Sequence, residues 1–484
     1  MKLNILQRRN EDNMRKTKIV CTIGPATESE EMLGKLIDAG MNVARLNFSH
    51  GTHESHLQTI QRIRKVAEKK RAPIAILQDL SGPKIRVGMI ENEPIHLKAG
   101  EMFILTSEPN VGTNDRVSVS FPELPEEVQI NDTVLLADGS VELEVTKIHQ
   151  NDIICKVVVG GELSSKKGVN LPGRTLSISA LTEKDKADLE FGLEQEVDFI
   201  AMSFVRRRKD VLQLKKMIEK HHKNVPVIAK IEKHEALDNI DEILEVVDGV
   251  MVARGDLAVE TALERVPLVQ KMLIHKCNQA SKPVITATQM LKSMVDNPRP
   301  TRAEANDVAN AVIDGTDAVM LSEETTIGKY PDKAVETMAK IIEVTESSRI
   351  ADKQRIRQSY DEPTSIAHAV SHAAYEMAKD LEAAAVLTPT QSGSTARIIS
   401  SYRPYHTIIA LSPDEKVVRR LNLVWGVYPM QSSGYLVFEE MIEQAKDKAL
   451  KSGLVKFGDV VVITAGMPIG MAGTTNLIKA EVLQ

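Results

Sequence analysis

Two short stretches place chemically active side chains directly after runs of apolar residues. The run 227–232 contains Lys230 and Glu232, and side chains two residues apart in a strand project to the same face. A second run, 249–256, ends in Asp256. One amine and two carboxylates at the ends of neighbouring parallel strands would form a site for a hard divalent cation with a positive charge beside it. The alternative is a structural Lys–Glu ion pair beside a solvated loop, the usual role of surface charges.

Eight short apolar runs, which alternate with segments of helical periodicity, could position these side chains. The runs are residues 18–24, 42–49, 74–80, 198–205, 227–232, 249–256, 283–289 and 318–324. Near-continuous apolar strands that alternate with helices are typical of a parallel sheet covered on both faces. Eight such units predict a closed (β/α)8 barrel, a TIM barrel, within the α/β fold class.

Polar side chains gather at the carboxyl ends of these runs. They are Arg45, Asn47, Asp79, Ser203, Lys230, Glu232, Asp256, Thr288 and Ser322. In a barrel the carboxyl ends of the strands share one rim, and active sites lie there. Any one of these residues could cap a strand, but nine of them at one rim predict an active site.

The alternation is interrupted after the third run by a segment of different composition. Residues 84–169 contain β-branched runs separated by Asn-Asp, Asp-Gly and Gly-Gly turn signals, which predict an inserted all-β domain. Glycine and proline occur on both crossings, Ser81–Pro83 and Lys167–Gly173, as in a hinge. We therefore expect a lid over the barrel mouth. The alternative is a passive insertion, since loops tolerate long insertions.

The barrel pattern ends near residue 350, in a charged and poorly periodic segment. An amphipathic helix from Ser365 to Leu381 and three apolar strands follow, which predicts a separate C-terminal α/β domain. The predicted parts are a flexible N-terminal tail (1–15), the barrel (16–83 and 170–350), the lid (84–169) and the C-terminal domain (351–484).

The composition excludes several classes of partner. The net charge of −6 gives no reason to expect a polyanion, and 3% aromatic residues leave little to stack on nucleic-acid bases. No apolar run approaches the roughly 20 residues that span a bilayer, and the N-terminus lacks the apolar core of a secretory signal. Cys21, Cys155 and Cys277 lie far apart, which favours a reducing, cytoplasmic compartment over a disulfide framework or a zinc site. Arg206–Arg208 is predicted to be a solvated basic face.

Seven motifs resemble those of the pyruvate kinase family. They are KIVCTIGPAT, GMNVARLNFSHGTHE, KGVNLPG, VIAKIEKHEAL, MVARGDLAVE, ATQML and NPRPTRAEANDVANAVIDGTDAVML. The motifs follow the family's order from about Thr17 to the C-terminus, which is far more specific than one short pattern. The resemblance implies a TIM barrel with a β lid and a C-terminal regulatory domain, assembled as a homotetramer. It also implies phosphoryl transfer from phosphoenolpyruvate to ADP, which gives pyruvate and ATP in glycolysis.

The resemblance implies a role for each residue on the phosphoryl side of the site. Glu232 and Asp256 would hold Mg²⁺, or Mn²⁺ in its place. Lys230 would neutralise the phosphoryl group in flight and the developing enolate. Arg45 would grip the phosphate with its planar guanidinium.

The resemblance also implies contacts for the substrate carboxylate, the enolate and the nucleotide. The carboxylate would meet the backbone N–H groups of Gly255 and Asp256 and the hydroxyl of Thr288. Thr288 would also lie in the proton relay to the enolate, where the final donor could be Thr288, a water molecule or another group. The positions that match the family's ADP and ATP contacts are Asn47, His50, Arg86 and Lys167. Lys167 comes from the returning lid crossing, so the lid would complete the site on closing.

The segment 79–84 departs from the family pattern. Many members have a glutamate at the position of Lys84 and need a bound K⁺ near the phosphate. The possible ligands for a monovalent cation that this chain retains are Asn47, Ser49, Asp79 and Leu80. Two like charges roughly 4–6 Å apart repel by several kcal/mol at an effective dielectric constant of about 20. We therefore predict an enzyme that does not require K⁺, with the Lys84 ammonium as its substitute.

A hydroxyl-rich segment, 387–396, joins a strand to a helix in the C-terminal domain. Hydroxyl and backbone N–H groups at a helix N-terminus form a cradle for an anion, and simple N-capping is the alternative. The predicted residues for an effector phosphate are Thr388, Thr390, Ser392, Gly393, Ser394 and Thr395. Family members that take fructose 1,6-bisphosphate add Trp and Arg from the last loop, and here that loop, Gly466–Gly470, has neither. We therefore predict a monophosphate effector such as a sugar phosphate or AMP.

Two other functions compete with an active pyruvate kinase. Another barrel enzyme of Mg²⁺–enolate chemistry, such as an aldolase or a lyase, would lack a β lid that carries Arg86 and Lys167. A non-catalytic metabolite sensor would lack members of the phosphoryl-side set, and all of that set is present.

Overall fold

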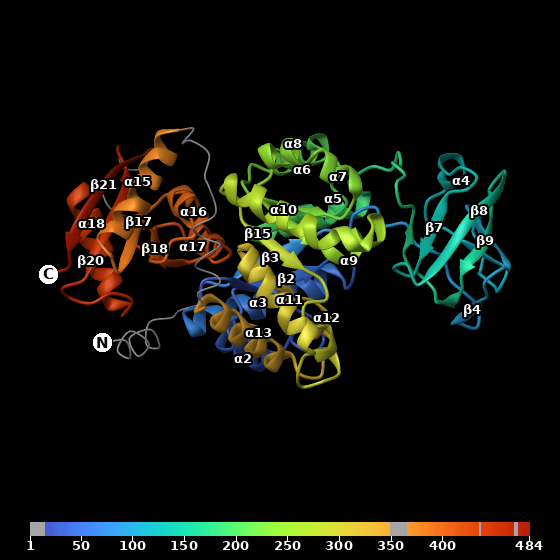
Figure 1. Ribbon diagram of the computed structural model, residues 1–484, viewed down its shortest axis with the longest axis horizontal. Coiled ribbons are helices and arrows are strands. Elements are labelled where there is room, and N and C mark those ends of the chain that lie inside the picture. Colours follow the sequence, from blue (N-terminus) through green and yellow to red (C-terminus); the bar gives the residue numbers. More distant parts are fainter. Residues whose placement is uncertain (1–14, 349–364, 435–436, 469–472) are drawn as a thin grey trace.

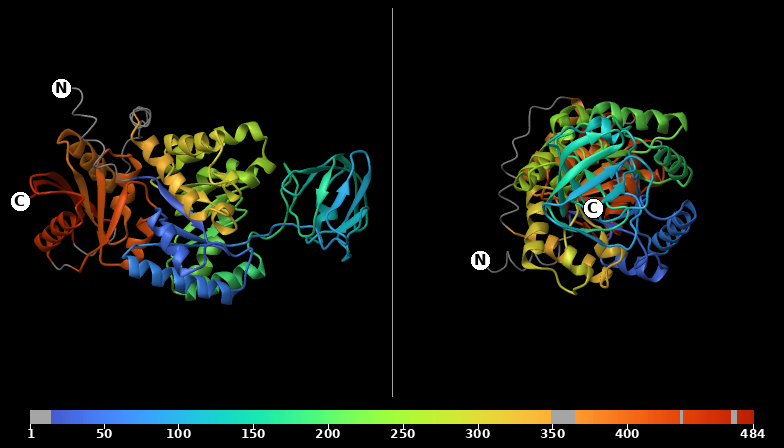
Figure 2. Two further views of the ribbon diagram at one scale, coloured as in Figure 1. Left: turned by 90° about the horizontal axis from the view of Figure 1, so that it is seen from below. Right: turned by 90° about the vertical axis from the view of Figure 1, so that its right-hand side faces the viewer.

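The computed structural model describes residues 15–348, 365–434, 437–468 and 473–484. A closed barrel lies in the middle, a β-rich insertion lies at one end and an α/β domain lies at the other (Figure 1). The left view of Figure 2 shows the three parts following one another along the long axis. The predicted fold class is confirmed. The predicted N-terminal tail, apart from Arg15, and the predicted boundary near residue 350 lie outside the described residues.

All eight predicted runs form strands of the barrel. In chain order they are β1 (Lys18–Thr22), β2 (Val43–Asn47), β3 (Ala75–Asp79), β12 (Phe199–Met202), β13 (Val227–Ile231), β14 (Gly249–Ala253), β15 (Val284–Ala287) and β16 (Ala318–Leu321). Neighbouring strands are parallel, and β1 pairs with both β2 and β16, so the sheet closes on itself. Parallel pairing brings all eight carboxyl ends to one rim.

Helices connect the strands and cover the barrel from outside (Figure 1). They are α2 (Glu30–Asp38), α3 (His53–Lys70), α5 (Glu183–Glu194), α6 (Arg208–Lys220), α7 (His234–Asp238), α8 (Ile240–Val246), α9 (Arg254–Glu260), α10 (Val266–Gln279), α11 (Arg302–Asp314), α12 (Glu323–Thr326) and α13 (Pro331–Glu346), with the short turns η1 (Leu263–Arg265) and η2 (Lys292–Val295). Thr52, Thr182 and Thr301 each form a capping box that satisfies N–H groups at a helix start.

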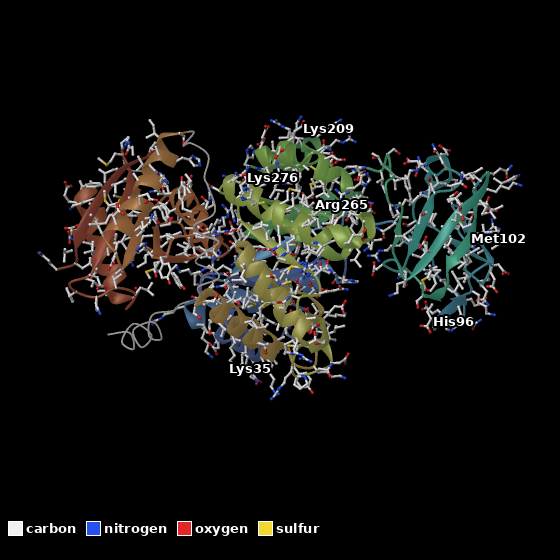
Figure 3. All side chains as sticks on the ribbon, in the orientation of Figure 1. Lys35, His96, Met102, Lys209, Arg265 and Lys276 are labelled. Atoms are coloured by element: carbon white, nitrogen blue, oxygen red, sulfur yellow. The ribbon has the colours of Figure 1, made fainter. Side chains whose placement is uncertain are left out.

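Charged side chains such as Lys35 and Lys209 lie at the outer margin of the molecule (Figure 3), so buried charges at the barrel mouth need a separate explanation. None of the helices in the described ranges combines the length and the apolar character that crossing a bilayer requires.

Apolar side chains fill both the inside of the barrel and the layer between its strands and helices. The inner set includes Val20, Val43, Leu77, Ile228, Met251 and Ile285. The outer set joins strand residues to the buried faces of α2, α3, α10, α11 and α13. The interior of the barrel is therefore a packed core, and a ligand has to bind at its mouth.

The insertion after β3 has its own β-sheets and its own core. Its strands are β4 (Ile95–Leu97), β5 (Met102–Thr106), β6 (Arg116–Ser118), β7 (Thr133–Leu136), β8 (Val141–His149), β9 (Asp152–Val159), β10 (Gly161–Leu163) and β11 (Val169–Asn170), with one helical turn, α4 (Leu124–Glu127). Six strands form a sheet in the order β11-β7-β8-β9-β5-β6, and β10 pairs with β4. Phe103, Leu105, Val134 and Leu143 are fully buried in this core.

The two chain crossings between the barrel and the insertion pair with each other. We call this pair the stem (residues 85–87 and 167–169). An antiparallel bridge joins Arg86 to Gly168. Beside it, the Val87 N–H donates to the Lys167 carbonyl at 2.9 Å. The insertion is therefore attached through a two-stranded connection rather than through two independent coils.

A five-stranded sheet with helices on both faces forms the C-terminal domain. Its strands are β17 (Ala385–Pro389), β18 (Thr407–Ser412), β19 (Val427–Gln431), β20 (Val460–Gly466) and β21 (Thr475–Val482), and its helices are α15 (Ile366–Asp380), α16 (Ser394–Ser401), α17 (Glu415–Leu421) and α18 (Phe438–Lys451). The order is β19-β18-β17-β20-β21, with β21 antiparallel to β20 and the other pairs parallel. β17 leads into α16 through the hydroxyl-rich segment.

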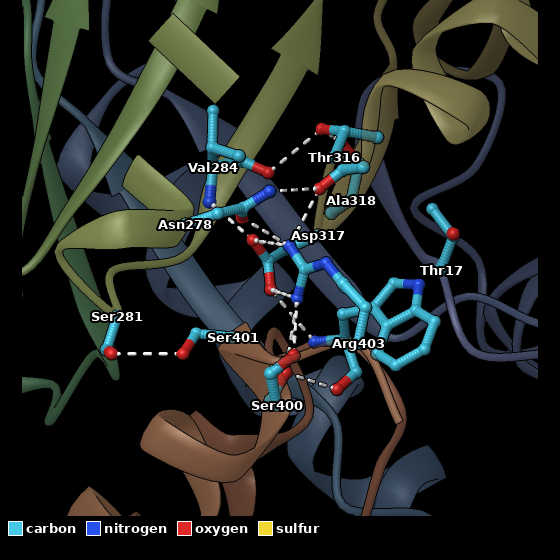
Figure 4. A network of polar contacts seen from close by, with 12 residues as sticks. Thr17, Asn278, Ser281, Val284, Thr316, Asp317, Ala318, Ser400, Ser401 and Arg403 are labelled. Carbon is cyan, nitrogen blue, oxygen red and sulfur yellow. Dashed lines mark hydrogen bonds and ion pairs between the residues drawn. The ribbon is translucent and has the colours of Figure 1, made fainter. Parts of the chain in front are cut away.

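The far end of α16 contacts the barrel at the amino ends of β15 and β16. The Arg403 guanidinium lies 3.0 Å from Asp317 and donates to the Asn278 side-chain oxygen at 2.6 Å (Figure 4). Ser281 and Ser401 share a hydrogen bond of 3.1 Å (Figure 4). Because Arg403 and Asp317 are both buried, this network fixes the C-terminal domain to the amino end of the barrel.

Candidate active site

Four neighbouring strands bring polar residues together at the carboxyl rim. β2 carries Arg45, β3 ends in Asp79, β12 is followed by Ser203, and β13 carries Lys230. The Lys230 Nζ lies 3.2 Å from an Asp79 carboxylate oxygen and donates to the Ser203 hydroxyl at 2.7 Å. It also lies 2.9 Å from a carboxylate oxygen of Glu232, which is 1% exposed. One ammonium therefore neutralises two buried carboxylates.

Arg45 lies beside this cluster, and its guanidinium is held on two sides. Its Nε and one terminal nitrogen contact the same Asp79 oxygen at 2.7 and 2.6 Å. Its other terminal nitrogen donates to the Thr22 hydroxyl at 2.9 Å. Arg45 is buried, so the plane of the guanidinium is fixed at the mouth. A guanidinium fixed in this way can present donors to an incoming oxyanion.

The charges of this cluster shift the pKa values of its members. Burial alone would lower the pKa of Lys230, but Asp79 and Glu232 outweigh it and raise that pKa. Burial would raise the pKa of Asp79, but Lys230 and Arg45 lower it. Burial and the nearby Asp256 raise the pKa of Glu232 despite the opposing effect of Lys230. Lys230 therefore stays protonated and Asp79 ionised, whereas Glu232 would be stabilised as a carboxylate by a further positive charge.

Glu232 and Asp256 fit the requirements of a divalent cation such as Mg²⁺. They come from the ends of β13 and β14, and each acts on the other as a like charge. Carboxylate oxygens are the preferred protein ligands of Mg²⁺, which usually takes one or two of them and fills its other positions with water and substrate oxygens. Across the described residues, groups of three or more His, Cys, Asp or Glu side chains suited to holding a metal are absent. A pair of protein carboxylates, without a third, matches that pattern.

Lys84 lies against one of these two carboxylates. Its Nζ is 3.0 Å from an Asp256 oxygen and 3.7 Å from Asp138, which belongs to the turn between β7 and β8 of the insertion. Burial alone would lower the pKa of Lys84, but Asp256 and Asp138 raise it. Lys84 therefore places a permanent positive charge at the rim and links the insertion to the start of α9.

The possible ligands for a monovalent cation lie at the ends of β2 and β3. Asn47 and Asp79 are partners in the register of these strands. The Asn47 side-chain oxygen accepts from the Ser49 N–H at 3.2 Å, and the Leu80 carbonyl accepts from the Ser203 hydroxyl at 2.7 Å. The oxygens of Asn47, Asp79 and Leu80 therefore already have donors or cations from the protein itself.

Thr288 follows β15 and lies against the first turn of α9. A Cβ added at Gly255 would lie 2.7 Å from the Thr288 Cγ2, so this close approach requires a glycine. The first N–H groups of a helix, here those near Gly255 and Asp256, have no acceptor within the helix. Backbone donors and a hydroxyl therefore lie together, as binding of a carboxylate requires.

The stem places the two predicted nucleotide-binding residues of the insertion close together. Arg86 and Lys167 lie on its opposite strands, and the Arg86 guanidinium donates to the carbonyl of Lys166 at 3.0 Å. The other two predicted residues, Asn47 and His50, lie at and just beyond the end of β2. Two separate elements, the barrel rim and the stem, thus contribute to the predicted nucleotide side.

The predicted effector residues lie where β17 turns into α16. Gly393 has a φ of 78° and begins the helix, and its N–H donates to the Thr390 hydroxyl at 2.9 Å. The hydroxyls of Thr388 and Thr395 are directed to protein partners, the Ile409 carbonyl (3.5 Å) and the Thr475 hydroxyl (2.5 Å). The remaining members, Ser392 and Ser394, are partly exposed at the helix start.

The prediction that Arg206–Arg208 form a solvated basic face is wrong for Arg206. Arg206 is 8% exposed and donates to the carbonyls of Leu176 and Ile178 at 2.6 and 2.7 Å. Arg207 and Arg208 are exposed, as predicted. The sequence of three consecutive arginines does not indicate which of them binds the segment that contains Leu176 and Ile178.

Two charged residues beside the site, Arg254 and Glu260, were not predicted to have a role. Glu260 is 4% exposed, accepts from the Asn170 side chain at 3.0 Å and lies 2.5 Å from Lys233. Arg254 contacts the segment after β15. Their closeness in the sequence to Asp256, which lies on the same helix α9, could have indicated such a role.

Two family models match the chain. The model described as "Pyruvate kinase, barrel domain" matches residues 14–335, and that described as "Pyruvate kinase, alpha/beta domain" matches residues 368–480. The first match includes the barrel and the insertion, and the second includes most of the C-terminal domain.

Similar proteins of known family cover nearly the whole chain. It is 51% identical over 475 residues to a pyruvate kinase of Geobacillus stearothermophilus, with 97% of this chain and 80% of that protein covered. It is 49% identical over 472 residues to a pyruvate kinase of Staphylococcus aureus, with 97% and 81% covered. A crystal structure of a pyruvate kinase from Cryptosporidium parvum superposes with a TM-score of 0.89 at 39% identity, covering 97% of this chain and 96% of that one. This chain therefore belongs to the pyruvate kinase family of phosphotransferases.

Proposed function

We propose that this protein transfers the phosphoryl group of phosphoenolpyruvate to ADP and that the remaining enolate takes up a proton to give pyruvate. The observation that carries the proposal is the Lys230 ammonium, held within 3.2 Å of two buried carboxylates at the barrel mouth. A cation fixed in this way stabilises negative charge that develops during a reaction, because it does not have to reorganise.

Arg45 and Lys230 act on the transferred phosphoryl group. The bond between phosphorus and the enol oxygen breaks, and a β-phosphate oxygen of ADP forms the new bond to phosphorus. Negative charge lies on the three equatorial oxygens during the transfer and passes to the enolate oxygen. The Arg45 guanidinium orients the phosphate, and the Lys230 ammonium neutralises first the phosphoryl oxygens and then the enolate.

Glu232 and Asp256 would hold Mg²⁺ or Mn²⁺ in this reaction. The ion supplies positive charge that neutralises phosphoryl and enolate oxygens when it is bound. The raised pKa of Glu232, caused by burial and by Asp256, supports a cation between these carboxylates. Lys84 contacts one carboxylate oxygen of Asp256, so the other oxygen can serve the ion.

Gly255, Asp256 and Thr288 act on the other end of the substrate. The two backbone N–H groups and the Thr288 hydroxyl bind the carboxylate and fix the three-carbon acid against α9. The same hydroxyl belongs to the relay that delivers a proton to the terminal carbon of the enolate. On the nucleotide side, Asn47 and His50 of the rim and Arg86 and Lys167 of the stem bind ADP as the insertion, residues 84–169, closes over the mouth like a lid.

A coupled assay of pyruvate release tests the proposed activity. Protein supplied with phosphoenolpyruvate, ADP and Mg²⁺ should form pyruvate and ATP in equal amounts, and removal of divalent metal by EDTA should abolish both. Pyruvate formed without ADP, or from an aldol substrate, would favour a different Mg²⁺–enolate enzyme. Complete inactivity together with effector binding would favour a metabolite sensor.

We further propose that catalysis does not require K⁺, because Lys84 supplies the monovalent positive charge. Rates in buffers with Na⁺, K⁺ or tetramethylammonium as the sole monovalent cation should agree within about twofold. The variant Lys84→Glu should become K⁺-dependent, since it replaces an ammonium with a carboxylate beside Asp256. A large, saturable activation of the wild-type enzyme by K⁺ would refute this proposal.

The C-terminal domain is proposed to bind a phosphorylated effector at the start of α16. Ser392, Ser394 and the first backbone N–H groups of the helix would hold one phosphate. Sugar monophosphates and AMP should therefore change the concentration of phosphoenolpyruvate that gives half-maximal rate. Ser394→Asp should abolish the response by repelling the anion, whereas Ser452→Ala, which removes a hydroxyl that donates to the Ala449 carbonyl at the end of α18, should leave it intact. A response confined to fructose 1,6-bisphosphate would contradict the proposal.

The family resemblance also supports a cytoplasmic homotetramer as the working form. Light scattering coupled to gel filtration measures the assembly directly, and a mass of one or two chains would contradict it.

A further inference from the structure

The backbone after β15 adopts an unusual conformation at Thr288. Thr288 and Gln289 have φ angles of 76° and 54°, in the left-handed region. A β-branched residue is rare in that region, and holding it there costs on the order of 1–3 kcal/mol unless the surroundings fix it. The position of the Thr288 hydroxyl therefore depends on whatever holds this turn.

The Arg254 guanidinium holds the turn by its carbonyl groups. Its Nε donates to the Ala287 carbonyl at 3.0 Å, and a terminal nitrogen donates to the Thr288 carbonyl at 2.7 Å. The other terminal nitrogen lies 2.6 Å from Asp307 on α11, which orients the guanidinium. The Arg254 side chain is 13% exposed, so these bonds form in a largely dry environment where they are strong.

The residue after Arg254 fixes the other side of the same threonine. Gly255 faces the Thr288 methyl group, and a Cβ there would approach it to 2.7 Å. One dipeptide at the start of α9 thus binds the backbone of Thr288 and shapes the space for its side chain. The same helix carries the metal-binding candidate Asp256, so Thr288 and Asp256 are positioned from one element.

We infer that Arg254 is a positioning residue of the reaction, which keeps the Thr288 hydroxyl aimed at the substrate carboxylate and the enolate. This inference rests on the role of Thr288 in the proposed function. Arg254 itself would touch no reacting atom. Its loss should therefore affect proton delivery through Thr288 and leave the binding of metal at Glu232 and Asp256 nearly unchanged.

Arg64 provides a matched control at the opposite end of the barrel. Its guanidinium also donates to two carbonyls, those of Ile74 (3.0 Å) and Glu196 (3.3 Å), and also lies beside a carboxylate, Asp198 (2.8 Å). Arg64→Met should therefore cost similar stability without contact with the site. Any extra loss of turnover in Arg254→Met then reports on Thr288 rather than on folding.

A double-mutant cycle tests the inference. In the wild-type background, Arg254→Met should lower kcat about 100-fold, the loss expected for a misplaced reacting group, and Arg254→Lys should recover part of it. In a Thr288→Ala background, Arg254→Met should lower kcat less than threefold further, because the residue that it positions is gone. Should Arg254→Met not fold, Arg254→Lys serves in the same cycle, with an expected loss of about tenfold that likewise disappears in Thr288→Ala.

Two readouts separate positioning from a structural role. Exchange of pyruvate C3 protons with deuterium oxide, followed by NMR, should slow by the same factor as kcat in Arg254→Met, while the Kd for Mn²⁺ changes less than threefold. Equal losses in both backgrounds, or equal kcat losses in Arg254→Met and Arg64→Met, would overturn the inference. If the wild-type enzyme makes no pyruvate, the proposed function itself fails. If it is active but Thr288→Ala keeps full turnover, the inference alone fails.

Discussion

The two rims of the barrel both bury carboxylates, but they neutralise them in different ways. At the amino rim, Asp198 accepts from the Ile76 N–H at 2.8 Å and lies 2.8 Å from both Arg64 and Arg419. Asp317 is held in the same manner by two backbone N–H groups and a guanidinium (Figure 4). Each of these carboxylates has several fixed donors and one arginine from the C-terminal domain. These two carboxylates therefore link the C-terminal domain to the barrel and bind backbone N–H groups at the starts of barrel strands.

At the carboxyl rim, carboxylates share cations and crowd one another. Asp79 and Glu232 share the ammonium of Lys230, and Asp256 pairs with Lys84. Proximity to Asp256 and burial raise the pKa of Glu232. Two like-charged carboxylates, Glu232 and Asp256, beside each other leave this rim able to take up a further cation.

The difference shows that burial of charge alone does not mark a functional site. Asp198 and Glu232 are equally inaccessible, each with a side chain 1% exposed. Both accept from a backbone N–H, Glu232 from that of Phe204 at 2.8 Å, and what distinguishes them is the charge nearby. Two arginines neutralise Asp198, whereas Glu232 has Asp256 as a like-charged neighbour. In a barrel, the first arrangement serves stability and the second serves binding and catalysis.

Removal of Lys230 should produce the largest effect. Lys230→Met should lower kcat on the order of 10³-fold, because one preorganised charge donor at the phosphoryl group is lost. The coupled pyruvate assay measures this loss, and circular dichroism checks that the barrel still folds. Lys276→Met, which removes a partly exposed lysine paired with Asp241 on the outside of the barrel, is the control and should keep normal turnover. A kcat within tenfold of wild type would remove Lys230 from the mechanism.

Removal of Arg403 should lower stability and leave catalysis nearly unchanged, the opposite of what is expected for Lys230. Arg403→Met breaks a buried ion pair, and the expected loss of stability is about 3 kcal/mol, since Asp317 keeps its backbone donors. Urea unfolding should show a lower midpoint, whereas kcat at saturating substrates should stay within about twofold. An unchanged midpoint, or a large loss of kcat, would contradict the division of labour between the rims.

A smaller effect should appear in how the free energy of unfolding depends on pH, through Lys18 at the amino rim. Burial, with a further contribution from Arg15, lowers the pKa of Lys18 to about 7, and its ammonium donates to the Val427 carbonyl at 2.7 Å. Between about pH 7 and the ordinary lysine value near 10.4, the unfolded chain binds a proton that the folded chain does not. Stability should therefore rise with pH across this window, by up to about 1.4 kcal/mol per pH unit, and the contribution is lost as pH falls through 7.

The variant Lys18→Met isolates this contribution. Its unfolding midpoint, measured from pH 7 to 9, should rise less steeply with pH than that of the wild type. Parallel curves for the two proteins would show that Lys18 does not lose its proton in this range.

Much of the fold followed from the sequence, because strand burial and strand ends leave local signals. The run 227–232 is apolar except where it reaches the rim, so Lys230 and Glu232 could be placed at the mouth. The contacts made between elements could not be predicted. Lys84 and Asp256 are separated by 172 positions, and their pairing depends on the path of the chain into the insertion. Nothing local to Arg254 indicates that its carbonyl acceptors lie at the end of the next strand and in the residue after it.

The stem has a consequence for how the insertion can move. Because Arg86 and Gly168 are bridged, neither crossing can slide or rotate without the other. Arg86 and Lys167 therefore change position together when the insertion tilts. Adding one residue to either crossing would turn its side chains to the opposite face. The length of these two short segments thus sets how the side chains of Arg86 and Lys167 are oriented relative to the barrel mouth.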